Sequence, residues 1–74
     1  METIHLDARG TRCPAPTLRL TAAYMRAQAG DIIELVADCE RFEHDVREWC
    51  AQMKKALLWL RDEGQSVKRC QIRM

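Results

Sequence analysis

One cysteine stands in a setting that favours sulfur chemistry. The sequence around it reads Arg12-Cys13-Pro14-Ala15-Pro16, directly before a segment rich in helix-forming residues. A proline suits the first position of a helix, because the N–H it lacks would have had no partner there. We therefore expect Pro14 at that position and Cys13 as the N-cap. Pro16 falls within the first turn, so both prolines stiffen the entry and fix where the Cys13 sulfur lies.

The charges near Cys13 favour its thiolate. The positive end of the helix dipole and the nearby Arg9, Arg12 and Arg19 would all stabilise the anion. A thiolate can attack a sulfane sulfur, hold it as a persulfide and surrender it to another nucleophile. No histidine or carboxylate is adjacent in sequence to act as a general base, so a protease-like cysteine enzyme is less attractive. The alternative is that Cys13 only fills a corner, as a small buried residue does.

Composition limits the classes of function. The 74 residues are 47% apolar and 31% charged, which predicts a single globular domain over residues 1–74. The chain lacks an apolar run of about 18 residues and a signal segment, so we expect a cytoplasmic protein without a membrane partner. A net charge of +1 gives no reason for direct nucleic-acid binding. Only the basic pairs Lys54-Lys55 and Lys68-Arg69 favour tRNA as a ligand, and solvated charges are the simpler interpretation.

The other cysteines predict no metal site and no cofactor. No two cysteines of the sequence form a C-x-x-C pair, so neither a zinc site nor a thioredoxin-type motif is indicated. The four cysteines are Cys13, Cys39, Cys50 and Cys70. Cys50 and Cys70 fall on apolar faces and are expected in the core. Cys39 follows a predicted strand in a loop. Cys39 is either an exposed cysteine without a chemical role or a second reactive thiol that resolves the persulfide as a disulfide.

Apolar periodicity predicts six elements. Alternation indicates strands at Thr3–Asp7 and 67–72, and a nearly continuous apolar run indicates a mostly buried strand at Ile32–Ala37. Helical spacing indicates helices at 14–29 and Phe42–Met53. Residues 56–60 either continue the second helix or form a strand, and Asp62-Glu63-Gly64 is a turn signal.

These elements predict an α+β fold. We expect a two-layer α/β sandwich with the order β-α-β-α-β-β, in which two helices cover one face of a four-stranded mixed sheet. The apolar face of the first helix is marked by Leu18, Ala22, Met25 and Ala29, and both helices would bury their apolar faces. Trp49 and Trp59 are expected to anchor the small core.

Several motifs together resemble the TusA/SirA family of small sulfur carriers. They are Leu6-Asp7-Ala8-Arg9-Gly10, the C-P-A-P stretch, Gly30-Asp31, Ala37-Asp38, Asp45-Val46 and Cys50, which cover nearly the whole chain. The resemblance implies the same βαβαββ sandwich, with Cys13 carrying the persulfide and Pro14 and Pro16 shaping its loop. Asp45 matches an acidic helix position that either faces a partner or is solvated.

Two positions depart from the family pattern. Lys54-Lys55 replaces a histidine-containing pair that is frequent before the third strand, which makes this edge more basic and suited to an acidic partner. Cys39 stands where an acidic residue commonly follows Ala-Asp.

The resemblance also implies partners. A cysteine desulfurase or rhodanese would donate sulfur, and a DsrE- or TusBCD-type protein would accept it, for tRNA 2-thiouridine-type thiolation or for sulfur oxidation. The protein would be a carrier with sulfurtransferase half-reactions rather than a full catalyst, and we expect a monomer. The rival hypothesis is a regulatory or redox-sensing interaction module, whose partner binding survives the loss of Cys13.

Overall fold

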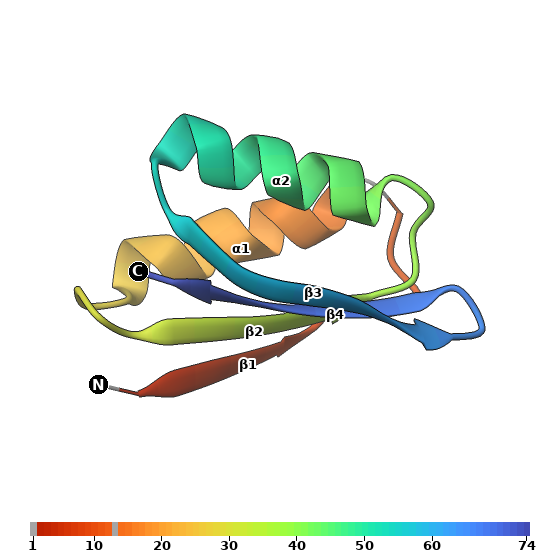
Figure 1. Ribbon diagram of the computed structural model, residues 1–74, viewed down its shortest axis with the longest axis horizontal. Helices are drawn as coiled ribbons and strands as arrows, with labels where there is room; N and C mark the ends of the chain where they lie inside the picture. Colours follow the sequence, from red (N-terminus) through yellow and green to blue (C-terminus); the bar gives the residue numbers. More distant parts are fainter. Residues whose placement is uncertain (1, 13) are drawn as a thin grey trace.

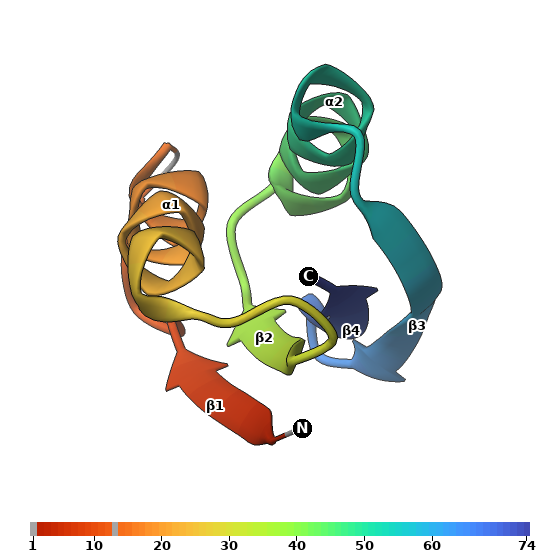
Figure 2. The same ribbon diagram turned by 90° about the vertical axis from the view of Figure 1, so that its left-hand side faces the viewer.

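Two helices cover one face of a four-stranded sheet in the computed structural model, which describes residues 2–12 and 14–74 (Figure 1). Figure 2 shows both helices on the same side of the sheet. The predicted α+β class and its order are therefore confirmed. The elements are β1 (Thr3–Asp7), α1 (Ala15–Arg26), β2 (Ile32–Ala37), α2 (Phe42–Met53), β3 (Ala56–Gly64) and β4 (Val67–Arg73).

The sheet is mixed and has the order β1-β2-β4-β3. β1 pairs with β2 in parallel, with Thr3 opposite Ile32, whereas β4 is antiparallel to both of its neighbours. β3 forms one edge, and its pairing with β4 shifts register at two places, between Leu57 and Trp59 and between Asp62 and Gly64. Such shifts mark β-bulges, which bend a strand and increase its twist.

α1 is shorter than the predicted helix. It begins at Ala15 and ends at Arg26, where the next residue, Ala27, takes an extended conformation. The nearly buried Asp31 side chain then accepts the backbone N–H groups of Gln28, at 3.0 Å, and Glu2, at 3.1 Å. These bonds stabilise a turn over residues that the sequence pattern assigned to the helix.

The segment after α2 is a strand rather than a continuation of the helix. Lys54 lies in the left-handed region at φ 57°, and the amide of Lys55 donates to the Cys50 carbonyl, which ends the helix. The hairpin turn lies later than the predicted Asp62-Glu63-Gly64 turn. Gln65 and Ser66 both have positive φ and connect Gly64 to its partner Val67. A two-residue turn of this kind matches the natural twist of paired strands.

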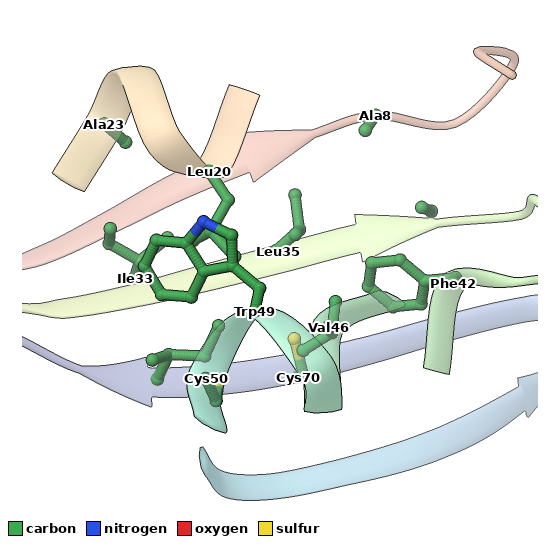
Figure 3. Packing of buried hydrophobic residues seen from close by; sticks show 12 residues of the cluster. Ala8, Leu20, Ala23, Ile33, Leu35, Phe42, Val46, Trp49, Cys50 and Cys70 are labelled. Atoms are coloured by element: carbon green, nitrogen blue, oxygen red, sulfur yellow. The ribbon is translucent and has the colours of Figure 1, made fainter. Parts of the chain in front are cut away.

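The core lies between the helices and the sheet (Figure 3). Trp49 is 8% exposed, its indole N–H donates to Thr21 Oγ1 at 2.9 Å, and its ring meets Tyr24 edge to face. The predictions that Trp49, Cys50 and Cys70 are core residues are confirmed. The buried cluster comprises Ala8, Leu20, Ala23, Ile33, Leu35, Ala37, Phe42, Val46, Trp49, Cys50, Cys70 and Ile72.

The predicted buried face of α1 is wrong. Leu18, Ala22 and Met25 are exposed, and Ala29 lies beyond the end of the helix. The buried positions are Pro16, Leu20 and Ala23. Both sets repeat at helical spacing, so periodicity alone does not distinguish them.

Trp59 does not anchor the core as predicted. It stands opposite Gln71 in the register of β3 with β4, is half-buried, and lies outside the core cluster. The Gln71 side chain donates to Glu34, which lies between the buried Ile33 and Leu35 in β2 and therefore points to the opposite face of the sheet. Trp59 is instead covered by the guanidinium of Arg61, whose carbon lies 4.7 Å from the ring centroid.

Leucine substitutions on opposite faces of α1 should separate core from surface. Leu20→Ala should lower the free energy of unfolding by about 2–5 kcal/mol, because it leaves a cavity in the core. Leu18→Ala removes a side chain from a residue that is 65% exposed, so it should change stability by less than about 0.5 kcal/mol. Urea denaturation, monitored by circular dichroism, measures the free energy of unfolding of both variants. Equal losses would contradict the face assignment.

Candidate functional site

The loop after β1 is held by backbone and side-chain hydrogen bonds from Ala8 to Thr11. The Ala8 amide donates to the Val36 carbonyl at 2.8 Å, and the Thr11 hydroxyl donates to the Ala8 carbonyl at 2.6 Å. Gly10 adopts φ +78°, a region that favours glycine, and its amide donates to Asp38 Oδ1 at 3.0 Å. The end of β2 therefore holds this loop in place.

The predicted persulfide-carrying residue, Cys13, lies outside the described residues, so the site is defined by its neighbours. The Ala15 amide donates to the Arg12 carbonyl at 2.7 Å. Pro14 holds the N-cap position of α1, one residue later than predicted, and its carbonyl accepts bonds from the Leu18 amide at 3.1 Å and the Thr17 hydroxyl at 2.9 Å. Together with the buried ring of Pro16, these contacts secure the first turn of α1.

The arginines predicted near the thiol divide into two groups. Arg9 donates to both carboxylate oxygens of Asp7, at 2.9 and 2.7 Å, and Arg19 donates to the Asp7 carbonyl at 2.8 Å. Hydrogen bonds from the Arg9 side chain and amide lower the pKa of Asp7 to about 2. Arg12 instead lines a surface cavity of about 350 Å³ with Thr11, Cys39, Glu40 and Arg41. Arg12 and Arg9 therefore face different surroundings.

A second hollow, of about 230 Å³, lies where α1 begins beside α2. It brings Asp45 next to Pro14, together with Thr17, Glu48, Trp49 and Gln52. Arg41 Nε lies 3.7 Å from Asp45 Oδ1, and His44 Nε2 lies 3.2 Å from Glu48 Oε2. We call this acidic hollow the helix groove.

Sequence reasoning identified Asp45 but missed its neighbours Glu48 and Gln52. Asp45, Glu48 and Gln52 follow helical spacing, so they share one side of α2. That spacing was the available signal. Only the tertiary structure shows that this side faces Pro14.

The structure does not bring Lys54 and Lys55 to this groove. They follow the last turn of α2, whereas α1 and α2 both begin at the opposite end of the molecule (Figure 1). Lys55 Nζ lies 5.3 Å from the centroid of the Tyr24 ring, a cation–π contact that gives this lysine a local partner. The two lysines and Asp45 thus belong to separate surfaces.

The cysteines differ in their surroundings. Burial raises the pKa of Cys50 and, with a contribution from the nearby Cys50, raises that of Cys70 to about 12. A nucleophilic thiolate is therefore disfavoured at both core positions. Cys39 is half-buried, packs against the core and lines the cavity that contains Arg12.

The described residues contain neither a candidate metal-binding cluster nor a helix that could span a membrane. Within residues 2–12 and 14–74, no three His, Cys, Asp or Glu side chains form a group that could hold a metal ion. In the same residues, neither helix has the length and apolar character needed to span a membrane.

Comparison with known proteins shows the family. The model of the sulfurtransferase TusA family matches residues 4–73, so the chain belongs to this family. A candidate sulfur carrier protein of Archaeoglobus fulgidus is 26% identical over 58 residues, covering 78% of this chain and 80% of that protein. The candidate sulfur carrier protein YrkI of Bacillus subtilis strain 168 is 33% identical over 63 residues, covering 85% and 84%.

The Asp7–Arg9 pair predicts an unusual titration. Because the pKa of Asp7 is lowered, to about 2 from an unfolded value of about 3.9, its pairing favours folding above pH 4. That contribution is lost as the pH falls through about 2. Arg9→Gln should move the pKa of Asp7 back towards its ordinary value. NMR titration of the Asp7 carboxyl carbon measures the shift, and an ordinary pKa in the wild type would contradict the pairing.

Proposed function

We propose that this protein is a sulfur carrier that takes a sulfane sulfur onto Cys13 as a persulfide and passes it to a partner protein. The observation that carries the proposal is the family match over residues 4–73, which includes the Arg12-Cys13-Pro14-Ala15-Pro16 stretch. Both of the relatives described above are named as candidate sulfur carriers, which supports the same role. Hydrogen bonds hold Arg12, Pro14 and Ala15, the described residues on either side of Cys13.

The proposed chemistry is exchange between sulfur atoms. The Cys13 thiolate attacks the outer sulfur of a donor persulfide, forming a new S–S bond, and the donor thiolate leaves. An acceptor thiolate then attacks the outer sulfur on Cys13 and restores the Cys13 thiolate. Each step breaks one S–S bond and forms another, so no external oxidant or reductant is needed. The protein completes two half-reactions rather than a full catalytic cycle on a small molecule.

The proposed partners are proteins of a cytoplasmic sulfur relay. A cysteine desulfurase or rhodanese would charge Cys13, and a DsrE- or TusBCD-type protein would discharge it. The end product is a thiolated tRNA uridine or an oxidised sulfur species, and the family match is compatible with both. The carrier itself needs no tRNA contact in either pathway.

The helix groove is the proposed contact for a basic side chain of a partner. Asp45 and Glu48 line it beside Pro14, so a partner that reaches this end of α1 meets negative charge. The Asp45 side chain is less exposed to water than the Glu48 side chain. The lower exposure strengthens the interaction of the Asp45 carboxylate with an incoming cation. Lys54 and Lys55 lie at the other end of α2, away from the groove. They therefore serve as control positions for a change of charge in the groove.

Loading at Cys13 can be tested by intact mass. After incubation with inorganic polysulfide, the wild-type protein should gain about 32 Da per sulfur, because the thiolate captures sulfane sulfur, and reductant should remove the gain. Cys13→Ser should stay unmodified while keeping its circular dichroism spectrum. Trypsin should place the added sulfur in the peptide that begins at Cys13.

Two results would count against the carrier role. Equal gains in the wild type and Cys13→Ser would assign the chemistry to another thiol. No gain in the wild type, with partner binding that survives Cys13→Ser, would favour the regulatory interaction module instead.

Charge reversal should distinguish the helix groove from the lysine pair. Asp45→Lys should slow sulfur transfer between the carrier and at least one relay partner severalfold, because the groove would repel a basic side chain. Lys54→Glu combined with Lys55→Glu should leave that rate within about twofold. Quenched time courses of sulfur transfer with purified partners measure the rates. A larger loss of rate in the double lysine variant than in Asp45→Lys would assign the docking surface to the lysine end of α2.

A further inference from the structure

The outer face of α1 carries an unusual apolar strip. Leu18 is 65% exposed and Met25 is 78% exposed, and the exposed Ala22 lies between them. The spacing of four and three residues places all three on one line of the helix. That line lies opposite the side that packs in the core, which is formed by Pro16, Leu20 and Ala23. We call Leu18, Ala22 and Met25 the outer strip.

The outer strip is bordered by positive charge. α1 contains Arg19 and Arg26 but neither aspartate nor glutamate. α2 has the opposite character at its start, where Glu43 and Asp45 lie in the first turn. The two helices therefore present different surfaces: an apolar and basic one on α1, and an acidic one where α2 adjoins the helix groove.

The outer strip is connected directly to the C-P-A-P stretch. Leu18 is five residues from Cys13 in the sequence, and its amide donates to the Pro14 carbonyl at 3.1 Å. Thr17, the residue before it, donates to the same carbonyl through its hydroxyl. A protein that covers Leu18 thus lies beside the first turn of α1, where a partner in sulfur transfer must approach.

We propose that the outer strip is the docking surface for a relay partner that offers an apolar cleft bordered by aspartate or glutamate side chains. This inference rests on the proposed sulfur-carrier function and adds the chemistry of the partner surface. Leu18 and Met25 enter the cleft as apolar anchors at i and i+7, as helices do when they bind in a groove. The carboxylates at the border of the cleft pair with Arg19 and Arg26, and the same arginines repel a basic partner at this strip.

The experiment compares relay steps with a step that needs no protein partner. A cysteine desulfurase, a rhodanese and a DsrE-type protein are purified as test partners, and sulfur transfer is followed with ³⁵S-labelled sulfur. The variant Leu18→Ser combined with Met25→Ser should raise KM for the carrier about tenfold in at least one relay step, with kcat changed less than twofold. A tenfold change is the loss expected when interface anchors are truncated. Loading by inorganic polysulfide should be unchanged.

Matched variants separate docking from general surface effects. Leu58→Ser alters another exposed leucine, on β3, and should leave KM within twofold. Arg26→Glu should raise KM for the same partner that responds to the double variant, and Arg26→Lys should restore most of the loss. Circular dichroism and urea denaturation check that each variant is folded.

Four outcomes would overturn the inference. One is wild-type kinetics for the folded double variant with all three partners, while polysulfide still loads Cys13; the carrier function would then stand without this surface. Another is a wild-type dimer in sedimentation that the double variant dissociates, because a second copy would then cover the strip. Strip-dependent binding to phosphatidylglycerol vesicles, without any effect on relay kinetics, would assign the strip to a membrane surface. Failure of polysulfide to load the wild type at all would remove the proposed function itself.

Discussion

The parallel pairing of β1 with β2 controls the geometry of the whole candidate site. Parallel neighbours require a crossover connection, and α1 supplies it by running back across the sheet. The ends of both strands then lie at one edge, where each continues into the loop before a helix. This is why Asp38 reaches the amide of Gly10, and why Thr11 and Arg12 share a cavity with Cys39.

The same constraint sets the relation between the two helices. Each helix starts at the edge where a parallel strand ends, so the beginnings of α1 and α2 lie at the same end of the molecule. Residues far apart in the sequence, such as Pro14 and Asp45, therefore line one groove. Lys54 and Lys55 are closer to Asp45 in sequence than Pro14 is, yet the length of α2 carries them to the other end.

Much of the fold was predictable because its signals are local. Alternation predicts β1, and a nearly continuous apolar run predicts β2. The apolar spacing of Phe42, Val46 and Trp49 predicts both the existence and the buried face of α2. α1 was harder, because it carries two apolar lines and only contact with the sheet decides which is buried. The hairpin turn was also displaced, since Gln65 and Ser66 lack the glycine that usually marks positive φ.

The candidate site was predictable only in part, because its composition depends on contacts between distant segments. The C-P-A-P stretch predicts which loop carries the candidate site. The hydrogen bond from the Gly10 amide to Asp38 and the helix groove between α1 and α2 both join segments that are far apart in the sequence. Neither contact has a periodic pattern in the sequence. Trp59 shows the same limit, because a bulge in β3 decides which face of the sheet it occupies.

The irregular pairing of β3 also bears on whether another chain can pair with this edge of the sheet. β3 is an edge strand whose first residues, from Ala56 to Leu60, are all apolar, and a regular edge of that kind is a template for pairing with another chain. The two shifts in register interrupt and twist the strand, and Arg61 and Asp62 place charge along it. A foreign strand would meet neither a straight row of backbone groups nor an uncharged one. The bulges thus oppose edge-to-edge pairing at this strand, although its first residues are apolar.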